Sequence, residues 1–386
     1  MLTALDRALS AVLRDTGWPI ELDPLLLRLF NAIQEGHTAV AVDTAQSSQI
    51  AALSHLVGSA PGEGLLTLHD GWLSLERHAA QEARIARWFR DRTSITTAMP
   101  AVDVAGIMPS ADQSQQEAIR HTLTHPCSII LGGPGTGKTT TAAAMIVAQL
   151  LAFPDRGRDI QLLAPTGKAA VRLTSSLTKA LQTIALTPAL LSRLPKAART
   201  IHSQLRRLSN ASLVVVDEAS MISVDLMDAL LRQISPSATV IFLGDPNQLA
   251  SVEAGYVLGV LAAHPAIASL RVTLNRRHRI DGNTALSAMQ DQLQAGDAAG
   301  FLRSLESHQG LIHPSEKKRI QARLFAGYRT YFEAWARGDD PLECGFQCLA
   351  AIQAGPFGVD ALNTAVVGIA QRFGLHGRGH RILVTE

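Results

Sequence analysis

The chain has 386 residues, enough for roughly two or three domains with separate apolar cores. Apolar residues make up 47% and charged residues 18%, a composition that excludes an intrinsically disordered chain. No window approaches the roughly 18 consecutive apolar residues of a membrane helix, so we expect no membrane span. Asp6 and Arg7 interrupt what would be the core of an export signal, and the three cysteines suit a reducing cytoplasm.

The net charge is only +2, but it is unevenly distributed along the chain. Residues 1–108 hold twelve Asp and Glu, eight Arg and no Lys, whereas residues 161–210 hold eight Lys and Arg and no acid. The run of basic residues in the second segment either arises by chance on a partly buried stretch or forms a face that binds a polyanion. Because Lys and Arg neutralise phosphates, the polyanion would be a nucleic acid.

The first part of the chain predicts a separate, mainly helical module. Amphipathic patterns at residues 25–30 and 85–89 flank a short strand at residues 38–42. Trp88 and Phe89 allow two interpretations, a ligand platform or a core contact, and the pattern favours the core. A stretch with Gly and Pro near residues 105–109 marks the boundary of this module, and the acidic, lysine-free composition of residues 1–108 favours a docking domain.

Strands then alternate with helices. Short apolar runs at residues 128–131, 160–164, 213–216 and 239–243 each lead into a polar loop. Continuous apolar strands separated by helices predict an α/β fold, with a parallel sheet covered by helices on both faces. Ligands of such sheets bind at the carboxyl ends of the strands, where the polar loops lie.

The first of these loops has the P-loop pattern and lies between a predicted strand and a predicted helix. Its residues are Gly132, Gly133, Pro134, Gly135, Thr136, Gly137, Lys138 and Thr139, with Thr140 following. The glycines let backbone N–H groups face a phosphate at the start of a helix. Lys138 is expected to reach the β- and γ-phosphates and the Thr139 hydroxyl to bind Mg²⁺. The predicted cofactors are therefore ATP and Mg²⁺.

Two further loops carry chemistry for the same site. Asp217 ends a predicted strand 79 residues after Lys138, where it can orient Mg²⁺, and Glu218 can accept a proton from the attacking water. Gln248 follows the next strand and is a candidate γ-phosphate sensor. A glutamine that only stabilises its turn is the alternative interpretation.

The order of these motifs resembles superfamily-one helicases, which implies a RecA-like domain. In that family the position of Gln115 reads adenine, residues 162–170 with Thr166 and Lys168 touch the DNA backbone, and residues 200–202 with His202 lie on the DNA side. Arg279 stands in the place of an arginine that contacts the γ-phosphate. His202 as a packing residue and Arg279 as a surface residue remain alternatives.

Longer strings resemble the RecD family, the alpha subunits of RecBCD exodeoxyribonuclease V complexes. They lie at residues 217–222, 243–255, 355–363 and 377–378, and residues 72–87 are similar to the docking domain of that family. The resemblance implies an ATP-driven 5′-to-3′ translocase on single-stranded DNA and duplex ends, working with RecB-like and RecC-like subunits in recombinational repair of double-strand breaks. It also implies an ATP-binding domain at residues 109–266 and part of a second RecA-like domain at residues 267–386.

The sequence ends at Glu386, where the family continues into a small β-barrel and two further helicase motifs. One of those motifs supplies a second arginine to the γ-phosphate, so we expect this polypeptide to bind nucleotide but to hydrolyse it poorly and not to unwind DNA. A stand-alone RecD-like helicase and a nucleotide-binding structural subunit without motor activity are the alternatives to a motor subunit.

Overall fold

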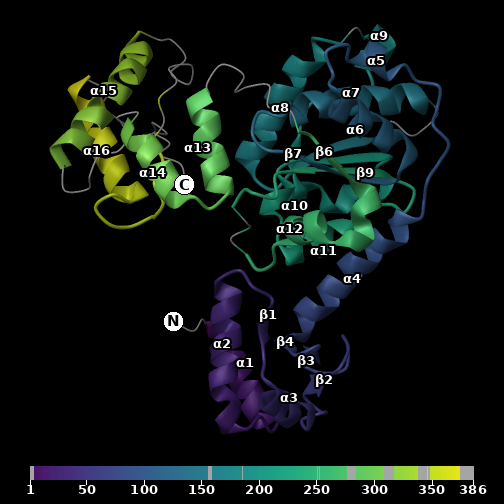
Figure 1. Ribbon diagram of the computed structural model, residues 1–386, viewed down its shortest axis with the longest axis vertical. Helices are drawn as coiled ribbons and strands as arrows, with labels where there is room; N and C mark the ends of the chain where they lie inside the picture. Colours follow the sequence, from purple (N-terminus) through teal and green to yellow (C-terminus); the bar gives the residue numbers. More distant parts are fainter. Residues whose placement is uncertain are drawn as a thin grey trace. The chain divides into compact units, whose positions relative to one another are not determined.

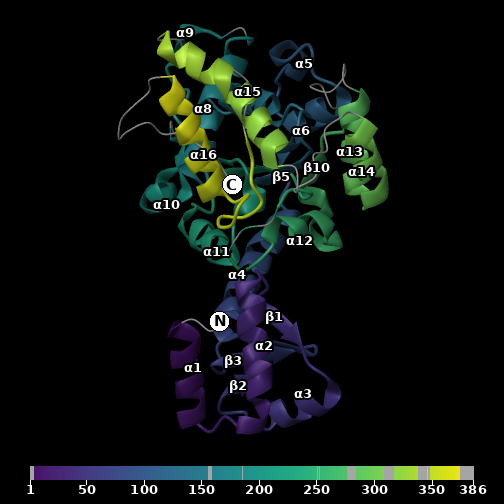
Figure 2. The ribbon, with the colours of Figure 1, turned by 90° about the vertical axis from the view of Figure 1, so that its left-hand side faces the viewer.

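The structure is a computed structural model in which the chain divides into two units, residues 1–284 and residues 285–386 (Figures 1 and 2). The residues described are 4–154, 159–184, 186–249, 251, 253–275, 284–307, 317–337, 346 and 348–373. Among them, no helix is both long and apolar enough to cross a membrane.

The N-terminal module, residues 4–75, combines helices with a four-stranded sheet of order β1-β4-β3-β2. Its elements are α1 (Ala4–Asp15), η1 (Ile20–Leu22), α2 (Asp23–Gln34), β1 (Ala39–Ala41), α3 (Thr44–Ala51), β2 (Val57–Gly58), β3 (Leu66–His69) and β4 (Trp72–Leu75). Helices dominate, as predicted, but the sequence analysis identified only the first strand. The other three are two to four residues long, too short for a clear alternating pattern.

The turn between β3 and β4 carried a signal that the sequence analysis missed. Asp70 and Gly71 connect the two antiparallel strands, with φ of 48° and 77°. Positive φ at both central residues is the geometry that tight hairpins need, and Asp-Gly is a favoured pair for it. The module has its own core, in which Leu29, Phe30 and Leu66 are almost completely buried.

Helix α4 (Glu76–Thr93) joins this module to the rest of the unit (Figure 1). It starts directly after β4, and its second half enters the core of the central domain, where Ile85 and Phe89 are buried. The ring centroid of Phe89 lies 5.7 Å from that of Phe242. Trp88 packs at the edge of the same core, so both aromatic residues pack as core residues.

The central domain is built on a six-stranded sheet of order β10-β5-β9-β8-β6-β7, in which every pair of neighbours is parallel. The strands are β5 (Cys127–Leu131), β6 (Ile160–Ala164), β7 (Arg199–Thr200), β8 (Leu213–Val216), β9 (Thr239–Gly244) and β10 (Arg271–Thr273). The four predicted strands correspond to β5, β6, β8 and β9, and the predicted parallel α/β fold is confirmed.

Helices cover both faces of this sheet because successive strand residues point to opposite sides. On one face Ile130, Val215 and Ile241 pack against α5 (Val104–Ile107), α6 (Gln113–Thr124), α7 (Lys138–Ala152) and α8 (Gly167–Leu181). On the other face Val214 and Phe242 pack against α4, α11 (Val224–Gln233) and α12 (Val257–Ala263). Shorter elements connect these layers: α9 (Pro188–Leu191), α10 (Ile201–Gln204), η2 (Leu205–Asn210), η3 (Ala219–Met221) and η4 (Pro265–Leu270).

Strand β10 extends the central sheet past residue 266, the boundary suggested by the sequence. Its residues pair with β5, and Leu274 N donates a hydrogen bond to Leu131 O over 2.7 Å. With three residues, β10 is too short to be recognised from its pattern. The division of the chain into domains at residues 108 and 266 stays a prediction.

The described residues of the second unit are almost entirely helical, in α13 (Thr284–Gln294), α14 (Ala298–Ser307), α15 (Lys317–Ala336) and α16 (Val359–Arg372). Helices α15 and α16 share a core that includes Tyr328, Phe332 and Val366. Whether this unit forms part of a RecA-like domain stays a prediction. Arg279 and the string at residues 377–378 lie outside the described residues.

Candidate functional site

The P-loop occupies the connection between β5 and α7, as the sequence predicted. Gly135 and Gly137 both have φ of 81°, a conformation that favours glycine. A Cβ added at Gly132 would lie 2.5 Å from Oγ1 of Thr136. Gly133, Pro134, Thr139 and Thr140 complete the loop and the first turn of α7, and each of them is at least partly exposed. The glycines therefore fit the backbone path that turns N–H groups toward an anion.

Lys138 folds back over this loop. Its Nζ donates hydrogen bonds to Gly132 O and, over 3.0 Å, to Gly133 O. Burial lowers the pKa of the lysine, and the negative charges of Asp245, Asp217 and Glu218 oppose that shift. A half-buried ammonium at a helix N-terminus, facing carboxylates, has the charge and position to meet a phosphate and its metal ion.

Asp217 and Glu218 follow β8. The backbone N–H of Asp217 donates to Leu163 O over 2.9 Å, and its Oδ1 accepts a 2.9 Å hydrogen bond from Glu218 N. Glu218 has φ of 53°, an uncommon value for a residue other than glycine. Burial is the main cause of a raised pKa at Asp217, and the charge of Glu218 adds to it. A nearby cation would therefore stabilise the ionised form of Asp217.

Gln248 lies in the turn after β9 and is exposed. Its Oε1 accepts a 3.3 Å hydrogen bond from Ser220 Oγ, which connects this turn to the loop after β8. The turn is closed by Gln248 N, which donates to Asp245 O over 3.2 Å. The amide group of Gln248 is thus held between two loops that both follow central strands.

Asp245 is a residue that the sequence analysis did not select. It is 2% exposed, and its Oδ1 accepts a 2.9 Å hydrogen bond from Asn247 N. Its charge has the largest effect among the carboxylates that act on the pKa of Lys138. The sheet order gives the reason: β9 is the direct neighbour of β5, whereas β8 lies one strand farther away. The available signal was an acid directly after a buried strand.

Gln115 lies beside the P-loop but is 1% exposed. Its side chain accepts a 3.1 Å hydrogen bond from Asp112 N in the capping box of α6, and its Nε2 donates to Thr136 O over 3.3 Å. These contacts hold the start of α6 against the loop. Recognition of adenine by Gln115 stays a prediction.

The three predicted DNA contacts follow neighbouring strands. Thr166 caps the N-terminus of α8, where its Oγ1 accepts a 3.2 Å hydrogen bond from Ala169 N, and Lys168 is exposed in the first turn. His202 is exposed on α10. Because β6 pairs with β7, these residues come from the same end of the same edge of the sheet. The structure thus brings them into one region, and their contact with DNA stays a prediction.

Within the described residues, no group of three or more His, Cys, Asp or Glu side chains could hold a metal ion by itself. Mg²⁺ commonly binds with one or two carboxylates, several waters and the phosphates of a nucleotide. The position of Asp217 near Lys138 fits this second kind of site.

Residues 110–317, more than half of the chain, match the family described as AAA domain. The RecBCD enzyme subunit RecD of Mycolicibacterium smegmatis is 30% identical over 82% of this chain and 60% of that protein. The corresponding subunit of Haemophilus influenzae is 34% identical over 59% of this chain and 36% of that protein.

Other matches are shorter or weaker. The ATP-dependent RecD2 DNA helicase of Deinococcus radiodurans is 38% identical over 40% of this chain and 20% of that protein. A crystal structure of Bacteroides Pif1 bound to single-stranded DNA has a TM-score of 0.33 at 19% identity and covers 55% of each chain. The chain thus spans between 36% and 60% of the length of the first RecD proteins that it matches. It belongs to the AAA domain family, as a nucleotide-binding P-loop protein whose relatives include RecD subunits of RecBCD enzymes.

Proposed function

We propose that this chain is an ATP-dependent 5′-to-3′ DNA helicase or translocase subunit of a RecBCD-type enzyme, which binds ATP with Mg²⁺ between β5, β8 and β9. The observation that carries the proposal is the convergence of three strand ends: Lys138 faces the charges of Asp245, Asp217 and Glu218. RecB-like and RecC-like subunits would be its partners, because the relatives are named as subunits of RecBCD enzymes. Such a complex would act on DNA ends in the bacterial cytoplasm.

Each residue has a defined part in this proposal. Lys138 and the P-loop N–H groups would bind the β- and γ-phosphates, and Thr139 with Asp217 would hold Mg²⁺, which neutralises phosphate charge when bound. Glu218 would accept the proton of the attacking water, and Gln248 would respond to the γ-phosphate from its place beside Ser220. Thr166, Lys168 and His202 would hold single-stranded DNA by its backbone.

Nucleotide binding by Lys138→Ala tests the proposed site. Loss of hydrogen bonds from a charged donor to phosphate is expected to weaken ATP binding about tenfold to a hundredfold, measured with a fluorescent ATP analogue. Lys179→Ala is the control, because Lys179 is an exposed lysine in the last turn of α8. Equal affinity of the Lys138→Ala and parent proteins would refute the site.

Two further measurements separate the motor subunit from other functions. ATP hydrolysis that rises when single-stranded DNA is added indicates a motor, whereas binding without DNA-dependent hydrolysis indicates a structural subunit. Co-purification with RecB-like and RecC-like subunits distinguishes a RecBCD-type complex from a stand-alone RecD-like helicase.

A further inference from the structure

A short segment, residues 253–256, connects three parts of the first unit and is here called the tether. On one side it binds the start of α11: Ser223 Oγ donates to Glu253 Oε2 over 2.8 Å, and Val224 N donates to Ala254 O over 3.1 Å. On the other side Gly255 N donates to Gly36 O of the N-terminal module over 2.8 Å. The tether is therefore fixed to the N-terminal module and to α11.

Tyr256 extends the tether to the nucleotide site. Its hydroxyl donates a hydrogen bond to the backbone oxygen of Pro246. Pro246 lies between Asp245, whose charge acts on Lys138, and Gln248, the proposed γ-phosphate sensor. The tyrosine thus touches the backbone of the turn without being one of the proposed nucleotide contacts.

The orientation of the Tyr256 ring depends on a missing side chain. A Cβ added at Gly259 would lie 1.8 Å from Cε1 of the ring, so the ring lies directly against the first turn of α12. Tyr256 also lines a cavity of about 700 Å³, together with Gly36, Thr38 and Phe89. This space gives the ring room to move when its contact with Gly259 is disturbed.

The charges around Tyr256 favour its role as a hydrogen-bond donor. Burial raises the pKa of the phenol, and the negative charge of Asp245 raises it further. The hydroxyl therefore keeps its proton at neutral and mildly alkaline pH, so that Pro246 O faces a donor over this range.

We propose that Tyr256 is a positioning residue for the turn at residues 245–248, and that the N-terminal module influences this turn through the bond between Gly36 and Gly255. The inference rests on the proposed ATP site. In the proposed site this turn carries Gln248, the γ-phosphate sensor, so a shift of Gln248 would weaken the binding of ATP and leave that of ADP, which has no γ-phosphate, unchanged. A partner that moves the N-terminal module would thereby change the preference for ATP over ADP.

Tyr256→Phe tests the first half of the proposal, because it removes the hydroxyl and keeps the ring. The measurement is the affinity of the full 386-residue chain for AMPPNP, a non-hydrolysable ATP analogue, and for ADP. We expect AMPPNP to bind about fivefold more weakly, the equivalent of one neutral hydrogen bond, and ADP to bind as before. Gly259→Ala, which displaces the ring, should have the same selective effect.

The matched control is Tyr331→Phe, which removes the hydroxyl of a similarly half-buried tyrosine on α15 in the other unit. It should leave both affinities unchanged. The positioning role is overturned when Tyr256→Phe keeps the parent ratio of AMPPNP to ADP affinity, or lowers both affinities equally.

Gly36→Ala tests the influence of the N-terminal module. Gly36 has φ of +92° and open space around a new Cβ, so alanine strains the backbone that carries the Gly36 oxygen without a clash. Gly62→Ala is the matched control, because Gly62 lies in the same module with φ of +96° and the same open space. The proposal requires the AMPPNP-to-ADP ratio to fall for Gly36→Ala and not for Gly62→Ala, and equal ratios in both variants would overturn it.

The outcomes distinguish this inference from the function on which it rests. A parent protein that binds neither AMPPNP nor ADP contradicts the nucleotide site, and the inference falls with it. A parent protein that binds both, with unchanged ratios in Tyr256→Phe and Gly36→Ala, contradicts the positioning role alone.

Discussion

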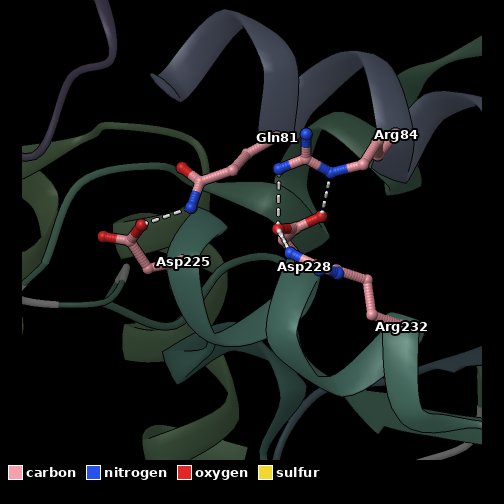
Figure 3. Close-up of polar contacts among 5 residues, drawn as sticks. All are labelled: Gln81, Arg84, Asp225, Asp228 and Arg232. Atoms are coloured by element: carbon pink, nitrogen blue, oxygen red, sulfur yellow. Dashed lines mark hydrogen bonds and ion pairs between the residues drawn. The ribbon is translucent and has the colours of Figure 1, made fainter.

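Arg84 of α4 and Asp228 of α11 form a two-point ion pair across 144 positions of sequence, with Nε 2.8 Å from Oδ1 and Nη2 2.9 Å from Oδ2 (Figure 3). Asp228 is 5% exposed, so this ion pair takes the place of most of the water that its carboxylate would otherwise contact. Next to it, Gln81 Nε2 donates to Asp225 Oδ1 over 2.5 Å (Figure 3). The two contacts fix α4, which begins at the N-terminal module, to the helix that the tether also binds.

Arg84→Ala should lower the free energy of unfolding by about 2 kcal/mol, because it leaves a buried carboxylate without two charge-assisted hydrogen bonds. Urea denaturation measures this loss. Arg232→Ala is the matched control: Arg232 Nη1 lies 4.0 Å from the same aspartate and its side chain is 65% exposed. A surface pair of this kind contributes at most about 1 kcal/mol to the free energy of unfolding. Equal losses in the two variants would therefore contradict a larger contribution of the Arg84–Asp228 pair.

Asp217→Asn should stabilise the nucleotide-free protein while weakening Mg²⁺-dependent ATP binding. Burial raises the pKa of Asp217 above the usual value of an aspartate, so the contribution of its protonated carboxyl to stability is present below that usual value and is lost as pH rises through the folded pKa. At neutral pH the buried charge therefore costs stability. We expect the asparagine variant to be more stable by about 1 kcal/mol at pH 7.5.

Thermal unfolding between pH 7.5 and pH 4 checks this sign, because the advantage of Asp217→Asn should shrink as the pH falls and the parent carboxyl takes up its proton. Asp15→Asn is the control, since Asp15 is exposed at the end of α1. A stability gain that is constant with pH, or equal in the control, would argue against a charge effect at Asp217.

Asp245→Asn should make ADP binding more sensitive to alkaline pH. Burial lowers the pKa of Lys138, and among the carboxylates whose charges oppose this shift Asp245 has the largest effect. Without it the pKa of Lys138 falls further, and the ammonium is lost at a lower pH as the solution becomes alkaline. The measurement is ADP affinity as a function of pH above neutrality.

Glu218→Gln provides the comparison for Asp245→Asn, because Glu218 has the smallest effect of the three carboxylates on the pKa of Lys138. In Glu218→Gln the loss of ADP affinity should begin at nearly the same alkaline pH as in the parent. If Glu218→Gln shifts this pH farther than Asp245→Asn does, then Asp245 is not the carboxylate with the larger effect on the pKa of Lys138.

Lys168→Ala should weaken binding of single-stranded DNA and reduce its dependence on salt. One lost phosphate contact lowers the slope of log affinity against log salt by about 0.7 for a single strand. Titration of a labelled oligonucleotide at several salt concentrations measures the slope. Lys179→Ala at the other end of α8 is the control, and an equal change in both variants would indicate a diffuse charge effect without a specific contact at Lys168.

The sequence alone predicted the strands that become β5, β6, β8 and β9, and the P-loop between the first strand and its helix. These features are local: glycine conformations, apolar runs and an acid that ends a strand are all properties of a few neighbouring residues. For the same reason β7, β10 and three short strands of the N-terminal module were not predicted, because their positions depend on their pairing partners.

Only the tertiary structure decided which strands are neighbours, and with that which charges act together. Because β9 lies beside β5, Asp245 has a larger effect on the pKa of Lys138 than the carboxylates that follow β8. The spacing of these residues along the chain does not predict this strand order. The tether is likewise visible only after folding, because Gly36 and Gly255 meet through backbone groups that carry no sequence signal. Local chemistry is encoded in short segments, whereas contacts between distant segments follow from packing both faces of one sheet.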